Sequence, residues 1–200
     1  MASYWINEVW SILTTADYKW SINNHIMTRI LLFLIFLTAI SCATKETVVE
    51  TTSSKSQTIY VVRHAEKADD GTNDPPLTAQ GRQRADLLAE ILGDKGIDRI
   101  YSSDYKRTRQ TATPLSRNTK IAIASYNPRN LEELFSQLEG LSGESILVVG
   151  HSNSTPSLAN LILGEEQYAK FDESDYNNLI QITIKGDKRT SKKLAFTLPQ

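Results

Sequence analysis

The chain has 200 residues, and its 22 Lys and Arg residues are balanced by 23 Asp and Glu residues to a formal net charge of −1. This balance excludes the basic excess typical of nucleic-acid-binding proteins, so no nucleic-acid partner is expected. A single cysteine excludes both an intrachain disulfide and a cysteine-based zinc site. The three histidines do not favour a three-histidine metal centre either, because His25 lies in an unrelated N-terminal segment.

A segment near the N-terminus resembles a bacterial lipoprotein signal. After Met27 come a basic residue, the apolar run 30–37 and small residues that end at Cys42, although Ala39 stands where leucine is usual. The apolar run is too short to cross a bilayer, which needs about 20 residues. We expect residues 27–41 to be a signal peptide and Cys42 to carry a lipid that holds the protein in the bacterial cell envelope, on the periplasmic or outer-membrane face. The alternative is a buried core helix with an incidental cysteine.

The segments that flank this signal have no domain-like pattern. Signals begin at the N-terminus of a chain, so residues 1–26, which hold all three tryptophans, are interpreted as a non-native extension upstream of the true start at Met27. Residues 42–57 are rich in Thr, Ser, Glu and Lys without an apolar period and are predicted to form a flexible tether. The globular domain is therefore predicted to span residues 58–200.

Strands and helices are predicted to alternate along this domain. The predicted strands are rich in β-branched residues and lie at 58–62, 97–102, 121–124 and 146–150. The predicted helices have apolar residues at helical spacing and lie at 79–92, 105–116 (interrupted at Pro114), 131–138 and 156–163. A closing hairpin is predicted from 179–184 and 194–198, on either side of Gly186-Asp187. The alternation predicts an α/β fold, a three-layer α/β/α sandwich with a mostly parallel central sheet.

Histidines follow the two strands predicted to be the most buried. Arg63-His64 comes directly after the run 58–62, and His151 comes directly after the run 146–150. In open parallel sheets, ligands bind outside the carboxyl ends of the strands, so His64 and His151 are expected to face each other if these strands are neighbours. Two solvated loop histidines are the alternative, which the equivalent positions of the two residues disfavour.

A basic segment follows a third predicted strand. It contains Lys106, Arg107 and Arg109, which cannot all point into one site from a helix, and at least one of them is expected to be a solvated surface residue. Guanidinium groups suit bidentate recognition of phosphate oxygens. A histidine beside an arginine is suited to act as a nucleophile, because nearby positive charge disfavours the imidazolium form. The predicted chemistry is attack on phosphorus, with fixed positive donors stabilising the oxygens.

Four motifs together resemble the histidine phosphatase superfamily, the phosphoglycerate mutase-like proteins, and occur in the family order. Arg63-His64-Ala65 resembles its Arg-His-Gly signature, residues 76–85 its Leu-Thr-x-x-Gly segment, residues 103–112 its Ser-x-x-x-Arg-x-x-Gln-Thr-Ala segment, and Gly150-His151 its second histidine motif. Ala65 departs from the signature glycine and is expected to restrict the approach of the backbone to a phosphate.

The resemblance implies a phosphoglycerate mutase-like fold and a phosphatase that hydrolyses phosphomonoesters or phosphoproteins through a phosphohistidine on His64. Arg63, Arg107 and His151 would hold the phosphoryl group. The resemblance implies no metal and no organic cofactor. The expected partners are a phosphorylated small molecule or a phosphoprotein as substrate, and a membrane reached through the lipid on Cys42.

Several alternatives stay open from the sequence. One is a non-catalytic phosphate- or anion-binding envelope lipoprotein, which the presence of both histidines and both arginines disfavours. Another is a phosphoglycerate mutase-type phosphotransferase, which the export signal disfavours. The proton donor is also open between Glu133, near the position of the acid in the mutase-like branch, and Glu66. An exposed helix carboxylate is an equally good interpretation of Glu133.

Overall fold

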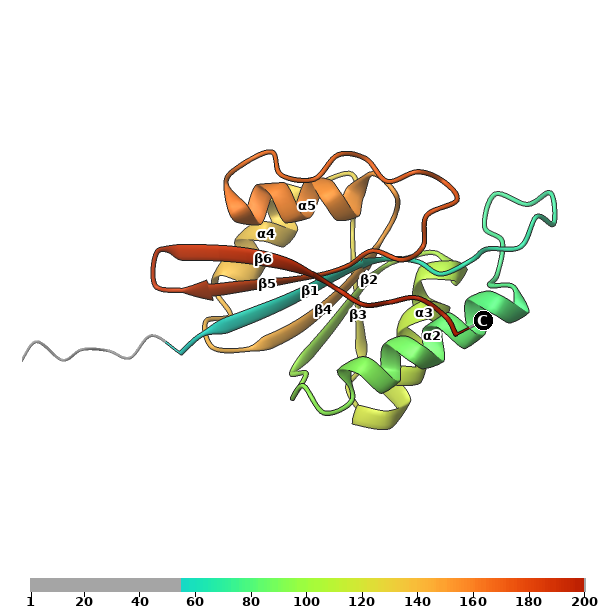
Figure 1. Cartoon of the computed structure of the whole chain (residues 1–200), viewed down its shortest axis with the longest axis horizontal. Helices are drawn as coiled ribbons and strands as arrows, with labels where there is room; N and C mark the ends of the chain where they lie inside the picture. The colour runs from blue at the N-terminus through green and yellow to red at the C-terminus, as the bar shows by residue number, and fades with distance from the viewer. Residues whose placement is uncertain (1–54, 200) are drawn as a thin grey trace, which may run out of the picture. The chain divides into compact units, whose positions relative to one another are not determined.

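The computed structural model describes residues 55–199 of the chain (Figure 1). The predicted N-terminal extension, signal peptide and Cys42 lie outside the described residues, as does most of the predicted tether. In the described part of the chain, no helix is both long and apolar enough to cross a membrane. The first strand begins at Gln57, the last residue assigned to the tether, because this side chain is 3% exposed and donates to the carbonyls of Leu138 and Leu141.

The domain is built on a six-stranded sheet with the order β3-β2-β4-β1-β5-β6. The strands are β1 (Gln57–Arg63), β2 (Arg99–Ser103), β3 (Ile123–Tyr126), β4 (Ser145–Gly150), β5 (Leu179–Lys185) and β6 (Lys188–Leu194). The strands β3, β2, β4 and β1 are parallel neighbours, whereas β5 runs antiparallel to β1 and β6 runs antiparallel to β5. The predicted mostly parallel sheet is confirmed, with an antiparallel hairpin along one edge.

Among the described residues, two helices cover each face of the sheet, which confirms the three-layer sandwich (Figure 1). The helices are α2 (Ala79–Leu92), α3 (Lys106–Thr119), α4 (Leu131–Glu139) and α5 (Ser154–Leu163). Alternate residues of β1 enter the two cores between these layers. Ile59 and Val61 pack in the core that includes residues of α4 and α5, while Tyr60 and Val62 pack in the core that includes residues of α2 and α3. Burial on both faces explains why this strand is almost entirely apolar.

Helix α3 is longer than its predicted range. It continues through Pro114 to Thr119 instead of being interrupted at the proline. Ala112 and Leu115, on either side of Pro114, are both fully buried, and their packing holds the helix together despite the missing backbone donor. The neighbouring strand β3 also differs, because it begins at Ile123 rather than at residue 121.

The second strand of the closing hairpin lies earlier than predicted. Strand β6 starts at Lys188, directly after a two-residue turn in which Gly186 has φ +59°, whereas 194–198 was predicted. The strand lies at the sheet edge and carries basic side chains, which protect the edge from pairing with another chain. These side chains also interrupt the apolar pattern from which a strand is predicted. Phe196, inside the predicted range, follows the strand and is buried.

Candidate active site

His64 lies at the carboxyl end of β1, where the strand leaves the sheet. Its backbone N–H donates to the carbonyl of Gly150 over 2.9 Å, and its side chain is buried. The imidazole Nδ1 lies 2.7 Å from the carbonyl oxygen of Ala65. Because a carbonyl can only accept a hydrogen bond, Nδ1 carries the proton in the neutral ring and Nε2 keeps a free lone pair. The local backbone thus fixes the tautomer that a nucleophilic histidine needs.

The environment of His64 keeps the ring neutral. Burial is the largest cause and, together with the charges of Arg63 and Arg107, lowers the pKa of His64 to about 3, although the Ala65 carbonyl acts in the opposite direction. The sequence indicated only the arginine as the cause, and the structure adds burial as the larger one. The nucleophilic form is therefore the resting form at neutral pH.

His151 follows the neighbouring strand and faces His64, as the sequence predicted. Strands β1 and β4 are adjacent and parallel, and the ring centroids of the two histidines lie 5.5 Å apart with the planes at 69°. The Nε2 atom of His151 lies 2.9 Å from Oγ of Ser103, at the end of β2, and its ring packs edge-on against Tyr105. Burial and the charges of Arg107 and Arg63 lower the pKa of His151 to about 4.

Arg107 projects into the same site from the first turn of α3. Its guanidinium lies over the ring of Tyr105, 4.4 Å from the centroid, and its Nη1 is 3.6 Å from a carboxylate oxygen of Asp74. Its Nε and Nη1 are buried and donate to no protein atom of the described residues. Arg109, in contrast, points away and donates to Ser125. As expected from helix geometry, Arg107 alone of the three basic residues in this turn lines the cavity with His64.

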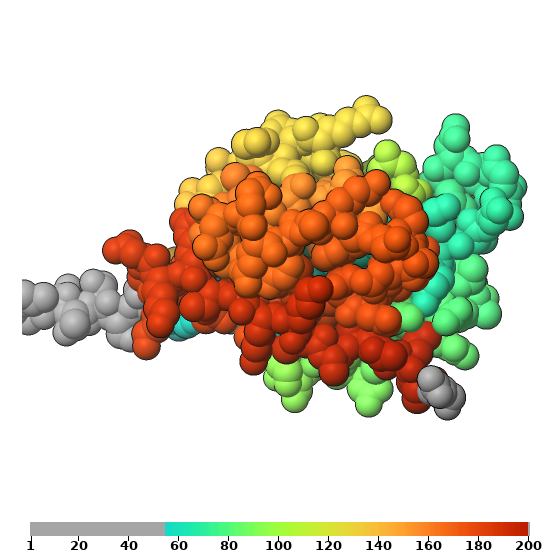
Figure 2. All heavy atoms as spheres, turned by 45° about the horizontal axis from the view of Figure 1, so that its top comes forward, coloured from blue at the N-terminus to red at the C-terminus, as the bar shows by residue number. Residues whose placement is uncertain are grey.

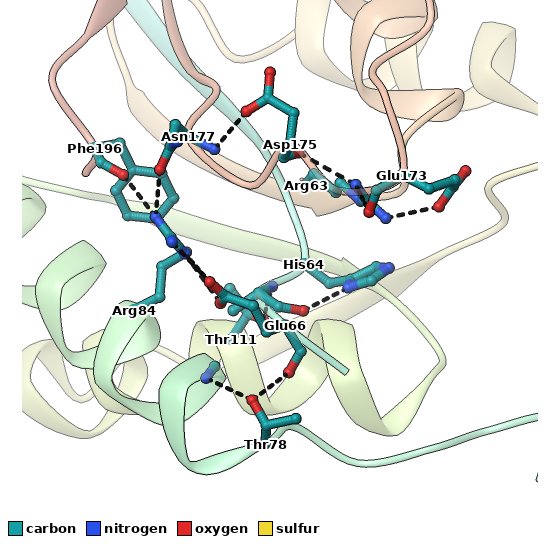
Figure 3. Close-up of polar contacts among 12 residues, drawn as sticks. Arg63, His64, Glu66, Thr78, Arg84, Thr111, Glu173, Asp175, Asn177 and Phe196 are labelled. Carbon is teal, nitrogen blue, oxygen red and sulfur yellow. Dashed lines mark hydrogen bonds and ion pairs between the residues drawn. The ribbon is translucent and has the colours of Figure 1, made fainter. Parts of the chain in front are cut away.

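The guanidinium of Arg63 is not free for the bidentate phosphate contact that the sequence suggested. Its Nη1 donates to the carbonyls of Asp172, Glu173 and Asp175, and its Nη2 donates to the Glu173 carboxylate over 2.7 Å (Figure 3). The ring of Tyr176 lies 4.3 Å from the guanidinium carbon. Only Nε of Arg63 is buried without a protein partner within the described chain. Arg63 can therefore offer one N–H to an anion instead of a bidentate pair.

A cavity of about 320 Å³ opens over the two histidines. Its lining is His64, Lys67, Tyr105, Arg107, Pro128, Arg129, His151, Ser152, Asn153 and Glu173. Three of these side chains are cationic and one is acidic. The segment after α5 lies at the surface (darker orange in Figure 2) and contributes the acidic side chain.

Comparison with known proteins agrees with this geometry. Residues 59–144 match the family model of the histidine phosphatase superfamily (branch 1). This part of the chain, less than half of its length, is similar to the histidine phosphatase superfamily. A relative from Escherichia coli O1:K1, named "Probable phosphoglycerate mutase GpmB", is 45% identical over 98 residues, which cover 40% of this chain and 46% of that protein. The chain thus spans less than half the length of this curated relative.

Two solved structures illustrate the similarity of the fold. Bacillus stearothermophilus YhfR has a TM-score of 0.58 at 18% identity, over 68% of this chain and 96% of that one. The protein histidine phosphatase SixA, in complex with tungstate, also has a TM-score of 0.58, at 20% identity, over 68% of this chain and 94% of that one. At these identities the likeness establishes the fold. Members of the histidine phosphatase superfamily are phosphatases or mutases.

The superfamily motif in α3 supports the backbone next to His64. Oγ1 of Thr111 accepts a hydrogen bond from the N–H of Ala65 over 3.0 Å, and Oε1 of Gln110 accepts one from the N–H of Leu77 over 2.7 Å. The motif thus fixes the loop that follows the nucleophile. The effect of Ala65 on phosphate approach stays a prediction.

Neither carboxylate considered from the sequence as a proton donor lines the cavity with His64. Glu66 forms a two-oxygen ion pair with Arg84, which is 5% exposed, and points away from His64 in Figure 3. Glu133 is exposed on α4, where it accepts a hydrogen bond from Asn130 and lines a different hollow. Glu66 is only two residues from His64 in the sequence, but its carboxylate faces Arg84 of α2 and not the cavity.

The sequence alone does not mark Glu173 as part of the site. Glu173 and Tyr176 contact Arg63 from more than a hundred residues further along the chain. Phe171, in the same segment, is buried in the core. No spacing or motif marks Glu173, because its contact depends on how the loop after α5 folds back over the sheet edge.

Proposed function

We propose that this protein is a phosphatase that works without a metal ion and forms a phosphohistidine on Nε2 of His64. The observation that carries the proposal is that three buried guanidinium nitrogens, Nε of Arg63 and both Nε and Nη1 of Arg107, have no hydrogen-bond partner among the described residues. Nη1 of Arg107 has only the ion pair with Asp74 at 3.6 Å. Buried charged donors are costly unless an anion accepts from them. They belong to the two arginines that flank a neutral histidine with a free lone pair.

These groups account for each part of the expected reaction. A phosphoryl group bound by Arg107 and by Nε of Arg63 would face Nε2 of His64, whose attack forms the phosphorus–nitrogen bond. His151 would stabilise the phosphoryl oxygens from the opposite side. Preorganised positive donors lower the barrier because they need no reorganisation when charge moves onto the oxygens. Water then hydrolyses the phosphohistidine and returns His64.

The substrate that we propose is a phosphoprotein or a small phosphomonoester. The cavity is small and is covered by no inserted domain among the described residues. The structural similarity to SixA, a protein histidine phosphatase, supports phosphoproteins among these substrates. A phosphohistidine substrate also fits a site in which neither Glu66 nor Glu133 can donate a proton, because imidazole is a better leaving group than an alkoxide.

The test is hydrolysis of 4-nitrophenyl phosphate by the purified protein in the presence of EDTA, beside His64→Asn. Release of nitrophenol and inorganic phosphate by the wild type, abolished in the variant, is expected. Brief incubation with ³²P-labelled substrate and alkaline quenching should also leave label on the wild-type chain that acid removes, as for phosphohistidine. No release, together with retained phosphate binding, would instead identify a binding protein. Transfer of the label to a second hydroxyl in place of water would identify a mutase.

We also propose that Cys42 carries a lipid and anchors the protein in the bacterial cell envelope. The order of basic residue, apolar run and small residues before Cys42 supports this proposal. Detergent-phase partition of the native protein, lost in Cys42→Ser, is the expected result. Peptide mapping of the same material tests the start site, because a native peptide that contains Trp10 would contradict initiation at Met27.

A further inference from the structure

Glu173 is the single carboxylate among the described residues that line the His64 cavity. Its Oε1 accepts a hydrogen bond from Oγ of Ser152 and its Oε2 accepts one from Nη2 of Arg63, each over 2.7 Å. The side chain is 65% exposed, so a ligand in the cavity can reach it. In Figure 3 the Glu173 carboxylate and the His64 ring extend in the same direction. An acid–base group therefore stands at the mouth of the site.

Buried contacts on both sides fix the position of this carboxylate. Upstream, the N–H of Phe171 donates to the carbonyl of Ser152 over 2.9 Å, and the Phe171 side chain packs in the core. Downstream, Asn177 accepts a hydrogen bond from Nη1 of Arg84, whose other nitrogens are held by Glu66 (Figure 3). The exposed carboxylate thus sits on a segment that is tied down at both ends.

The charges around Glu173 determine when it holds a proton. In the free protein, the Ser152 hydroxyl is the largest cause that lowers its pKa, and Arg63, Lys170 and Lys67 act in the same direction, so the group is a carboxylate at neutral pH. A bound phosphomonoester adds a second anion beside it. Two neighbouring anions favour a state in which they share one proton, and the monoanion of a phosphomonoester, with a pKa of about 6, brings that proton with it.

We propose that Glu173 is a catalytic residue that donates a proton to the leaving oxygen and later takes one from the attacking water. The proposal rests on the phosphatase function proposed above. In the first step, Nε2 of His64 bonds to phosphorus, the phosphorus–oxygen ester bond breaks, and the departing oxygen takes the proton from the Glu173 carboxyl. In the second step, water bonds to phosphorus, gives one proton to the Glu173 carboxylate, and the phosphorus–nitrogen bond breaks. The cycle returns neutral His64 and protonated Glu173, with inorganic phosphate as the product.

The two oxygens of the carboxyl group have separate tasks in this scheme. Oε2 stays bonded to Nη2 of Arg63 through both steps, because a carboxyl group keeps one acceptor oxygen when it is protonated. Oε1, now bonded to Ser152, carries the proton. A purely positional role, in which Glu173 only orients Arg63, would make every substrate depend equally on the residue. If Glu173 donates a proton, hydrolysis depends on this residue more strongly when the leaving group is more basic.

The experiment is a series of aryl and alkyl phosphates with leaving groups from 2,4-dinitrophenol to phenol and glycerol, hydrolysed by the wild type, Glu173→Gln and Glu133→Gln. For Glu173→Gln we expect a loss in kcat/KM of about 100-fold or more on phenyl phosphate and less than about 3-fold on dinitrophenyl phosphate. Glu133→Gln is the matched control, because it makes the same change on α4 outside the cavity, and should follow the wild type throughout. An equal loss on every substrate, or no loss, would overturn the proposal.

The same series separates this proposal from the proposed function. If the wild type hydrolyses none of the phosphates, the phosphatase function fails, and a binding measurement still tests Glu173. Titration with vanadate in buffers of different ionisation enthalpy measures the protons taken up on anion binding. The wild type should take up about one proton more than Glu173→Gln. Equal uptake by the two proteins would show that Glu173 does not share a proton with a bound anion and would overturn its role.

Discussion

Nδ1 of His64 lies 2.7 Å from the carbonyl oxygen of the next residue, Ala65. This contact needs no distant partner to orient the ring, because the backbone that leaves β1 supplies the acceptor. The N–H of Ala65 is in turn held by Thr111. The orientation of the nucleophile is thus a property of the strand end and of the helix packed behind it.

Substitution of His64 by asparagine should separate chemistry from binding. The asparagine amide can still donate to the Ala65 carbonyl, but it has no nucleophilic nitrogen. We expect kcat to fall by more than about 1,000-fold, whereas the affinity for inorganic phosphate should change by less than about 3-fold, because the guanidinium donors remain. Steady-state kinetics and calorimetric titration with phosphate measure the two quantities. Loss of phosphate binding together with activity would mean that His64 is chiefly a binding residue.

Arg107 should be far more sensitive to substitution than its neighbour Arg109. Lysine keeps the charge but replaces the fork with a point charge. Within the described chain, the buried Nε and Nη1 of Arg107 have no hydrogen-bond partner, although Nη1 forms an ion pair with Asp74 at 3.6 Å. We expect Arg107→Lys to weaken phosphate binding by about 10- to 100-fold. Arg109→Lys, a change of the same kind in the same helix turn, should leave it unaltered, because Arg109 contacts Ser125 outside the cavity. Similar losses in both variants would show a general effect of basic charge.

The low pKa of His64 also predicts how stability depends on pH. The folded protein holds this ring neutral down to a pKa of about 3, whereas the unfolded chain protonates it near the ordinary histidine pKa of 6.5. Between these values the unfolded state binds more protons, so the free energy of unfolding falls as the pH falls. From pH 7.5 to 5, His64 should account for a loss of about 2 kcal/mol. Urea unfolding of the wild type and of His64→Asn at both pH values measures this contribution. An equal loss of unfolding free energy in the two proteins would contradict the prediction.

The sequence predicts the centre of this domain better than its edges. β1 and β4 are buried on both faces, so their apolar composition identifies them as strands. Their positions in turn place His64 and His151 together at the carboxyl ends of two neighbouring strands. β6 carries the basic residues of an edge strand, and its range was misjudged. Glu173 could not be assigned at all, since its position depends on a loop whose fold is set by tertiary contacts to Arg63. The apolar pattern of a sequence predicts the strands that are buried, but it does not predict hydrogen bonds between residues that are far apart in the chain.

Glu66 should behave as a structural residue. Its carboxylate and the guanidinium of Arg84 form a largely buried pair, with side chains 13% and 6% exposed. Breaking such a pair leaves an uncompensated charge, so Glu66→Gln should lower the free energy of unfolding by about 3 kcal/mol. Urea unfolding measures this loss. A variant of unchanged stability that loses activity on poor leaving groups would return Glu66 to the role of proton donor.

Gly81 is required by the close approach of α2 to the loop that follows His64. A Cβ atom at this position would collide with the backbone carbonyl of Glu66, the group that also accepts from the N–H of Thr78. Neither backbone can yield without losing the hydrogen bonds that fix the loop, so Gly81→Ala should destabilise the domain by about 1–3 kcal/mol. Gly140→Ala is the control, because its Cβ would meet a neighbouring atom at an ordinary 3.5 Å. Equal unfolding free energies for the two variants would show that the packing of α2 is loose, and that the glycine of this motif serves another purpose.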